Sequence, residues 1–443
     1  MQRRTLILYA LCFSTLAGCR SQGIPTPSPT SQGINPATLA DPIAQADSFR
    51  LVNWGSLYDI GEQIKALRRP PVLPPKRTML VLSGGGMYGA FTAGILVGWS
   101  TLGTRPNFDV VTGVSTGALI AGLVFVGPAY DAELQRLYTT ITADDIYKRR
   151  RILRSLLTDA IADSTPLANI IERMTTPEYM QRVVEEHAKG RRYFVGTTDI
   201  EARRPVIWDM GAIATKKTPE SVDLFRKVLL ASAAIPGFFP PVKIPVEIDG
   251  IKYEERHVDG GVTSSLFVRP PWVPIEMRDD PYYTSLYDAD LYLIVAGKLY
   301  ADAQVVRPYT LNIASSSITS LIYSQSRDEL FRMYTSSVLI GMNYNLASLP
   351  EDFQVSPVST DFNPVEMSRL FEEGVRQIRS GVSWRKTPPG VEKGERTPLR
   401  AGNPLIRMTT GSPNPLISPT TLPRFPLPGV GERNLPLNTP IIK

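Results

Sequence analysis

The stretch "VLSGGGMYGAFTAGIL" (residues 81–96) joins one apolar segment to another through a turn that is rich in glycine. The turn holds Gly84, Gly85 and Gly86 in a row, and Gly89 follows three residues later. Glycine loses more conformational entropy on folding than any other residue, so such a run indicates a need for close backbone approach. Backbone N–H groups at the start of a helix suit a negative charge, either a phosphate or an oxyanion formed during a reaction.

The sequence around this turn alternates between strand and helix patterns. We expect a strand over 78–83, a helix over 89–102, a strand over 108–114 and a helix over 116–127. This order, with short turns, is typical of an α/β fold with a parallel sheet. The remaining expected elements are strands at 191–200, 204–210 and 290–297, a hairpin turning at Asp249-Gly250 and a long helix over 311–346.

A dinucleotide site is a first interpretation of the glycines, because residues 84–89 formally match G-x-G-x-x-G after a strand. That site also needs an acidic residue about 20 positions further on, at the end of the second strand. Here the second strand begins with Asp109 and ends in "GVSTG", with no acid at its tip. The sequence therefore gives little support to a nucleotide site.

The second strand ends in a G-x-S-x-G motif, Gly113-Val114-Ser115-Thr116-Gly117. Between an apolar strand and an apolar helix, this motif predicts a nucleophile elbow, in which a sharp turn exposes the serine hydroxyl. The alternative is an ordinary strand-to-helix turn with Ser115 as the helix N-cap.

A nucleophilic serine needs a base, and two interpretations are open. His257 lies two residues before Asp259 in "ERHVDGG", so on a strand both side chains share a face. In a Ser-His-Asp esterase, His257 would be the base, with an acid between Ser115 and His257 in the chain. The candidate acids are Asp199, Asp209 and Asp223. Alternatively Asp259 is itself the base, and Gly260 and Gly261 let the backbone turn away from the site.

Four motifs occur in a characteristic order: "GGGMYG" (84–89), "GVSTG" (113–117), "LASAAIPGFFPP" (230–241) and "DGG" (259–261). Over about residues 76–300 the chain resembles the patatin-like phospholipase family. The resemblance implies a three-layer α/β/α fold with a mainly parallel central sheet, and hydrolysis of lipid acyl esters through a Ser-Asp dyad.

The resemblance also assigns roles to single residues. It makes Ser115 the nucleophile and Asp259 its base, and it places an oxyanion hole at the backbone N–H groups of Gly84, Gly85 and Gly86. It implies no cofactor, and no set of residues with metal-ligand spacing occurs in the sequence. The aromatic residues of the 230–241 motif are expected beside the site, in the acyl groove.

One position departs from the family pattern. The family usually has a basic residue just before the last glycine of the loop, whereas this chain has Tyr88. The missing cation affects how the loop is held or how an anionic head group is received. The backbone donors, Ser115 and Asp259 are intact, which argues against the third hypothesis, a non-catalytic lipid-binding envelope lipoprotein.

The N-terminal segment has the pattern of an export signal. Arg3 and Arg4 precede a short apolar run over 6–13, and "LAGC" (16–19) follows it. This end resembles the lipobox of bacterial lipoproteins, in which the chain is cleaved before the cysteine and the cysteine is triacylated. The resemblance implies a lipoprotein signal peptide over 1–18 and a lipid anchor at Cys19. It predicts a cell-envelope location, with the outer membrane favoured if the source has two membranes.

The rest of the chain is divided by composition. We expect a disordered tether over 19–45, a lead-in helix and Pro-rich linker over 46–75, the hydrolase domain over 76–383 and a Pro-rich disordered tail over 384–443.

The resemblance to the phospholipase family implies membrane lipids as the substrate and partner, and charge and patterning are compatible with a membrane surface. The net charge of +6 is compatible with an anionic membrane surface and too weak to indicate nucleic acid. Residues 147–164 have the pattern of a basic amphipathic helix, which packs on the sheet or contacts lipid head groups.

Overall fold

The computed structural model describes most of the chain between residues 75 and 389. The described ranges are 75–149, 160–248, 250–268, 286–302, 310–340, 342–356, 358–381 and 384–389. All of them belong to one compact unit, Met1–Glu395. The predicted signal peptide, Cys19, the tether and the lead-in helix lie outside the described residues, as does the chain from residue 390 onward. Within the described residues, no helix combines the length and the apolar character needed to span a bilayer.

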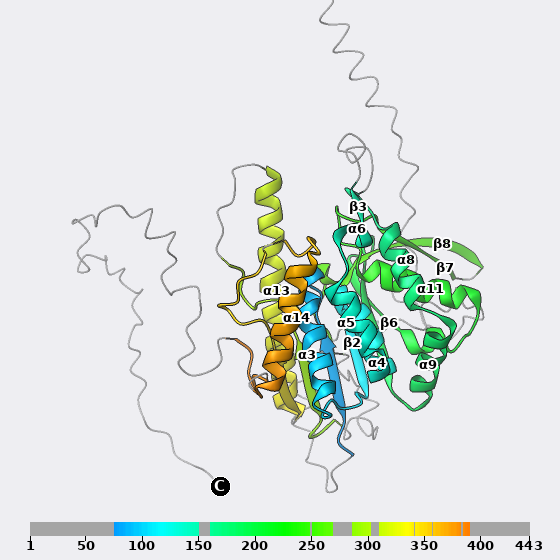
Figure 1. Ribbon diagram of the computed structural model, residues 1–443. Coiled ribbons are helices and arrows are strands. Elements are labelled where there is room, and N and C mark those ends of the chain that lie inside the picture. Colours follow the sequence, from blue (N-terminus) through cyan, green and yellow to red (C-terminus); the bar gives the residue numbers. More distant parts are fainter. Residues whose placement is uncertain are drawn as a thin grey trace, which may run out of the picture. The chain divides into compact units, whose positions relative to one another are not determined.

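A single large sheet forms the centre of this unit (Figure 1). Among the described residues it has eight strands, seven of them in the order β10-β9-β1-β2-β5-β8-β7, while β6 pairs with β5. The first five strands of this order are mutually parallel, and β6, β7 and β8 are antiparallel to their partners. Their bounds are β1 Thr78–Leu82, β2 Val110–Val114, β5 Arg192–Asp199, β6 Arg204–Asp209, β7 Val242–Ile248, β8 Ile251–Asp259, β9 Asp290–Ile294 and β10 Asn343–Ala347.

Helices cover both faces of the sheet, because alternate residues of its buried strands point to opposite sides. On β1, Leu80 and Leu82 belong to the larger apolar core, and Met79 and Val81 to a second core on the other face. The larger core contains side chains of α3 (Gly89–Thr101), α4 (Thr116–Val126), α5 (Asp131–Thr139), α6 (Ala143–Ile146), α8 (Thr165–Met174), α9 (Pro177–Ala188), α10 (Met210–Ala214), α11 (Pro219–Ser232) and α14 (Pro364–Arg379). The second core is closed by α13 (Thr310–Ile340). The prediction of a three-layer α/β/α fold with a mainly parallel sheet is confirmed.

Two glycines bring α3 and α14 unusually close together. A Cβ atom at Gly94 would lie 2.0 Å from the carbonyl oxygen of Phe371, and one at Gly374 would lie 2.3 Å from that of Phe91. No larger residue fits at either position without moving a helix backbone. This contact fixes the start of α14, and with it the preceding residues 358–363, beside the end of β1.

The long C-terminal helix is shorter than expected. It ends at Ile340, and residues 343–346, predicted as the end of the helix, belong instead to the edge strand β10. Gly341 and Asn343 disfavour a helix. In the strand, Tyr344 and Leu346 join the core that α13 closes.

The basic segment 147–164 is not helical at its ends. Lys148–Arg149 and Ala162–Asp163 are the strands β3 and β4, which pair antiparallel. The predicted helix is therefore wrong for these residues, and 150–159 lie outside the described residues.

Trp384 belongs to the folded part although the sequence places it at the start of the tail. Its ring lies 5.0 Å from that of Trp99 and 4.9 Å from that of Tyr292, measured between centroids. The next residue, Arg385, exchanges backbone hydrogen bonds of 2.8 Å with Leu346 of β10. The fold thus extends past the predicted boundary at residue 383.

Candidate active site

Ser115 stands at the turn between β2 and α4 in a strained backbone conformation. Its φ is 55° and its ψ is −129°, a region that residues with a side chain rarely adopt and that costs about 1–3 kcal/mol. The flanking glycines permit the turn: a Cβ atom at Gly113 would lie 2.3 Å from the carbonyl oxygen of Gly117, and one at Gly117 would lie 2.5 Å from that of Ser83. The G-x-S-x-G spacing therefore matches the steric demand of an elbow that raises Ser115 above the sheet.

A second serine holds this elbow in place. The backbone N–H of Ser115 donates to the Ser232 hydroxyl at 2.9 Å, and that hydroxyl donates to the carbonyl oxygen of Gly196 at 2.7 Å. Ser232 is fully buried at the end of α11, within the predicted 230–241 motif. It links the elbow to β5, and this role was not predicted from the sequence.

Asp259 reaches Ser115 because of the register of the sheet. The pairing of β2 with β5 ends at Val114 opposite Gly196, and β8 takes the next position, with Asp259 opposite Thr197. The last residue of β8 therefore lies beside the turn that follows β2. The Ser115 side chain lies close enough to the Asp259 carboxyl group to lower its pKa, and both residues are only 7% exposed.

The surroundings of Asp259 make it a stronger base than an exposed aspartate. Burial raises its pKa from the ordinary 3.8 to about 6, and hydrogen bonds from Ser115 and from the backbone N–H of Gly261 oppose the rise. The N–H of Gly261 lies 2.7 Å from Oδ1 of Asp259. A Cβ atom at Gly260 would lie 2.5 Å from the carbonyl oxygen of Gly196, so this glycine lets the backbone turn against β5.

His257 has other partners. Its Nδ1 lies 3.1 Å from the Thr197 hydroxyl, its Nε2 lies 3.2 Å from Oε2 of Glu255, and its ring packs edge-on against Trp208. These contacts do not bring the ring to Ser115.

The acids that a triad would need are also engaged elsewhere. Oδ1 of Asp199 accepts the N–H groups of the turn after β5, Asp209 caps α10, and Asp223 pairs with Lys227. The geometry therefore favours the pairing of Ser115 with Asp259 over the triad.

The glycine loop passes directly in front of Ser115. A Cβ atom at Gly84 would lie 2.9 Å from that of Ser115, and one at Gly85 would lie 2.3 Å from the carbonyl oxygen of Ala296. Among the described residues, the N–H groups of Gly84 and Gly85 donate no backbone hydrogen bond, whereas the N–H of Met87 donates to the carbonyl oxygen of Ser359. The loop thus keeps backbone donors beside the serine.

The last two glycines of the loop fit tight contacts. Gly86 has a φ of 56°, and its Cβ would lie 2.3 Å from the carbonyl oxygen of Ser359. A Cβ atom at Gly89 would lie 2.6 Å from the Thr116 hydroxyl, at the start of α3. The sequence motif therefore corresponds to a loop packed between the elbow and residues 358–363.

Tyr88, which replaces the expected basic residue, is buried beneath this loop. Its hydroxyl donates to the carbonyl oxygen of Ser356 at 2.5 Å, and burial raises its pKa above the ordinary value. It ties the loop to the segment before α14. In this chain the position therefore has a neutral anchor.

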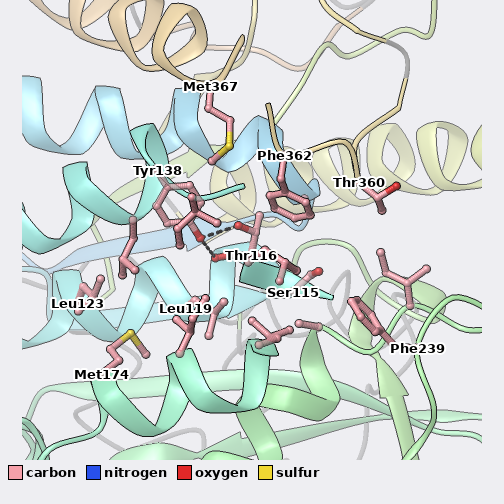
Figure 2. A pocket seen from close by; sticks show the side chains of 18 residues that line it. Ser115, Thr116, Leu119, Leu123, Tyr138, Met174, Phe239, Thr360, Phe362 and Met367 are labelled. Atoms are coloured by element: carbon pink, nitrogen blue, oxygen red, sulfur yellow. Dashed lines mark hydrogen bonds between the residues drawn. The ribbon is translucent and has the colours of Figure 1, made fainter. Parts of the chain in front are cut away.

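A mostly apolar cavity leads away from Ser115 (Figure 2). Its empty volume, including the opening to solvent, is about 740 Å³. The lining residues are Gly86, Ser115, Thr116, Leu119, Leu123, Leu137, Tyr138, Ile141, Ile146, Leu167, Ile170, Met174, Ala233, Ile235, Phe239, Thr360, Phe362 and Met367. Of the two aromatic residues in the 230–241 motif, Phe239 lines the cavity and Phe238 packs edge-on against Tyr147 and Phe239.

A buried carboxyl group holds the segment after Asp259. Glu329 of α13 accepts the N–H groups of Ser265 at 3.2 Å and Leu266 at 2.9 Å, each on a separate oxygen. The Thr112 hydroxyl of β2 donates to the carbonyl oxygen of Phe267 at 2.6 Å. These contacts anchor the chain just beyond the DGG turn. Glu329 was not predicted, because it lies far along the chain in a helix without a motif.

The described residues contain no cluster of three or more His, Cys, Asp or Glu side chains that could hold a metal ion.

Comparison with known proteins gives one match to a protein family. Residues 80–272 match the family model of patatin-like phospholipases, which lies within the region of the predicted resemblance. The fold is the patatin fold, a mixed α/β structure whose sheet is dominated by parallel strands. The match supports a lipid hydrolase.

The similarity to individual proteins is low. The chain is 26% identical over 203 residues to the uncharacterized protein YjjU of Escherichia coli (strain K12), over 44% of this chain and 48% of that protein, so it spans about half the length of this relative. Among solved structures it is similar to VipD from Legionella pneumophila, with 14% identity, a TM-score of 0.36 and coverage of 70% of this chain and 67% of that one. It also matches a chain of the SpcU–ExoU complex from the type III secretion system of Pseudomonas aeruginosa, with 12% identity, a TM-score of 0.21 and coverage of 68% and 53%.

Proposed function

We propose that the protein hydrolyses acyl esters of membrane lipids through a dyad of Ser115 and Asp259. The observation that carries the proposal is the sheet register that places the Asp259 carboxyl group beside Ser115, at an apolar cavity whose empty volume, including the opening to solvent, is about 740 Å³. A lipid acyl chain is the kind of group that such a cavity accepts, because its burial removes apolar surface from water.

The chemistry follows from the position of each group. Ionised Asp259 accepts the proton of the Ser115 hydroxyl as its oxygen attacks the ester carbonyl carbon. The carbonyl oxygen becomes an oxyanion, which the N–H groups of Gly84, Gly85 and Gly86 stabilise; loss of one such donor typically costs about 3–4 kcal/mol of barrier. Collapse expels the alcohol, which takes the proton from Asp259. Water then attacks the acyl-enzyme with Asp259 again as base, and the fatty acid leaves.

The experiment that tests this function measures the release of fatty acid from mixed phospholipid vesicles. The protein is the chain without its first 19 residues, and Ser115→Ala and Asp259→Asn are measured beside it. We expect release by the wild type and none above background in either variant. Ser326→Ala is the matched control and is expected to retain full release, because Ser326 is a half-buried residue of α13 whose hydroxyl donates to the carbonyl oxygen of Ile322 in the same helix. Absence of release by the wild type, together with no labelling of Ser115 by a fluorophosphonate, would favour a lipid-binding protein without activity.

We also propose that the protein is anchored to the cell envelope by a lipid on Cys19. The support is the sequence "LAGC" after a short apolar run. Three acyl chains exceed what stable anchoring needs. Cys19→Ser is expected to move the protein from the membrane fraction to the soluble fraction of expressing cells. Unchanged membrane association of this variant would contradict the anchor.

A further inference from the structure

The cavity at Ser115 is a channel lined on one side by a face of α4 and on another by a face of α8. On α4 the lining residues are Thr116, Leu119 and Leu123, and on α8 they are Leu167, Ile170 and Met174. Both sets have the spacing i, i+3, i+7, which places each set on one face of its helix. Figure 2 shows Leu123 and Met174 at one end of the cavity, Phe239 and Thr360 at the other, and Ser115 between them.

Apolar side chains form the end of the channel at Met174. Leu137, Ile141, Ile170 and Met174 line both this cavity and a second hollow. The second hollow has a different character, because its other lining residues are Glu133, Arg136, Thr140, Asp145 and Arg173. A hydrocarbon chain gains by burial up to this end, and the charged hollow behind it offers no such gain.

The polar groups inside the channel are already paired. The Tyr138 hydroxyl lies 2.6 Å from the Thr116 hydroxyl and donates to the Thr116 carbonyl oxygen at 3.1 Å. In this pair, visible in Figure 2, each hydroxyl already has a hydrogen-bond partner within the protein. Between Ser115 and Leu123 the wall is therefore suited to hydrocarbon.

The length of the channel can be estimated from α4. The steps from Ser115 to Leu123 span about 12 Å at a helical rise of about 1.5 Å per residue. An extended chain advances about 1.2 Å per bond, as the reach of an extended backbone implies. The distance therefore corresponds to an acyl chain of about ten carbons.

We propose that this channel selects its substrate by acyl-chain length, with Leu123 and Met174 as the stop, and that it favours medium-chain esters of about ten carbons. The proposal rests on the function proposed above and adds the substrate class. Leu123 and Met174 act here as specificity-determining residues that contact the end of the chain.

The test uses p-nitrophenyl esters with chains from about four to about sixteen carbons, each below its micelle-forming concentration, with the chain lacking its first 19 residues. We expect kcat/KM to rise by up to about fourfold for each added methylene and then to fall beyond about ten carbons. Leu123→Phe is expected to move the optimum to shorter chains by about two carbons, and Met174→Ala to longer chains by a similar amount.

Ile120→Ala is the matched control. Ile120 is fully buried on the same helix and does not line the cavity, so this variant loses core volume without changing the channel. Its optimum is expected to stay at about ten carbons, whatever stability it loses. If an optimum moves equally in Ile120→Ala and Met174→Ala, general loosening of the core explains the shift and the proposal is wrong.

The ester assay distinguishes a failure of this inference from a failure of the proposed function. Hydrolysis of short esters with a rate that keeps rising to about sixteen carbons, and no shift in the variants, overturns the length selection and leaves the hydrolase intact. If no ester is hydrolysed, displacement of a fluorescent fatty acid from the same protein by fatty acids of increasing length still tests the channel. Affinity that peaks at about ten carbons and moves with Met174→Ala supports the stop, and affinity that keeps rising overturns it.

Discussion

Asp259 and His257 lie two residues apart on the same face of β8, and they differ in their distance from Ser115. Asp259 is the last residue of the strand, lies opposite Thr197 and is close enough to the Ser115 side chain for that side chain to lower its pKa. His257 lies opposite Asp199, about 7 Å further from the end of β2, and both its ring nitrogens contact buried side chains.

The register of β8 in the sheet sets which of the two residues lies beside Ser115, and the identity of the residues does not reveal it. Histidine is the more common general base, with an ordinary pKa near 6.5. Here the sheet places an aspartate beside Ser115, the proposed nucleophile, and burial raises the pKa of this aspartate to about 6, close to that value. A fold can thus obtain a base that works near neutral pH from either residue, and the position decides which one acts.

The largest effect that separates the two residues is on the rate of ester hydrolysis. Asp259→Asn removes the proton acceptor of Ser115 and is expected to lower kcat by about 10³-fold or more. His257→Gln removes a buried contact to Glu255, so it is expected to lower the melting temperature while kcat of the folded protein stays within about threefold of the wild type. The measurement is steady-state hydrolysis of a short p-nitrophenyl ester, with the folded fraction checked by circular dichroism. An equal collapse of kcat in the folded His257→Gln protein would restore the triad.

A smaller loss is expected when the elbow loses its clamp. Ser232→Ala leaves the N–H of Ser115 and the carbonyl of Gly196 without their shared partner, at a cost of about 1–3 kcal/mol. We expect kcat to fall by about tenfold to hundredfold, because the hydroxyl of Ser115 is no longer held against Asp259. Ser221→Ala is the matched control, since Ser221 is a buried capping residue of the same helix. A similar loss of kcat in both variants would mean that only helix stability is at stake.

A still smaller loss is expected at Glu329, which positions the segment after Asp259. In Glu329→Gln one oxygen that accepts a backbone N–H becomes an amide donor, so one of the two hydrogen bonds is lost. We expect kcat to fall by about tenfold with KM nearly unchanged, because the acyl cavity does not include this residue. Glu373→Gln on α14, also a buried carboxylate, is the control and is expected to keep kcat. A change confined to KM would contradict a positioning role.

An effect of a different kind, on stability, separates Asp259 from an exposed aspartate. Its pKa is higher in the folded protein than the ordinary 3.8, so folding takes up a proton and the free energy of unfolding falls as the pH rises from about 4 to about 6. Asp259→Asn avoids this cost and is expected to be more stable than the wild type at pH 8, by up to about 3 kcal/mol. The difference is expected to vanish near pH 4. Urea unfolding of both proteins at the two pH values measures it, and equal stability at pH 8 would show that Asp259 is not desolvated.

Much of the fold was predictable because its signals are local. The elbow at Ser115 and the turns at Gly113 and Gly117 depend on backbone geometry within a few residues, which glycine and serine reveal directly. The parallel pairing of β1 with β2 follows from the short strand–helix–strand connection between them. The reliance on local signals also explains the error at β10. The apolar residues of this edge strand continue the helical spacing of α13, so the sequence predicts one longer helix.

The supports of the site were not predictable in the same way. Ser232 reaches Gly196 across 36 positions, and Glu329 reaches Leu266 across 63. Their roles depend on which elements the sheet and α13 bring together, so residue type and local spacing carry no signal for them. The choice between His257 and Asp259 depended on the register of β8 for the same reason.

The central claim is that Asp259 is the base of Ser115, and the most direct test is the pH dependence of Ser115 labelling by a fluorophosphonate. In the wild type the labelling rate is expected to rise with pH and to be half-maximal near the Asp259 pKa of about 6, since the ionised carboxylate is the proton acceptor. The same curve is expected in His257→Gln, and a rate at least about a hundredfold lower at every pH in Asp259→Asn. Retention of the full curve in Asp259→Asn, with its loss in His257→Gln, would contradict the account.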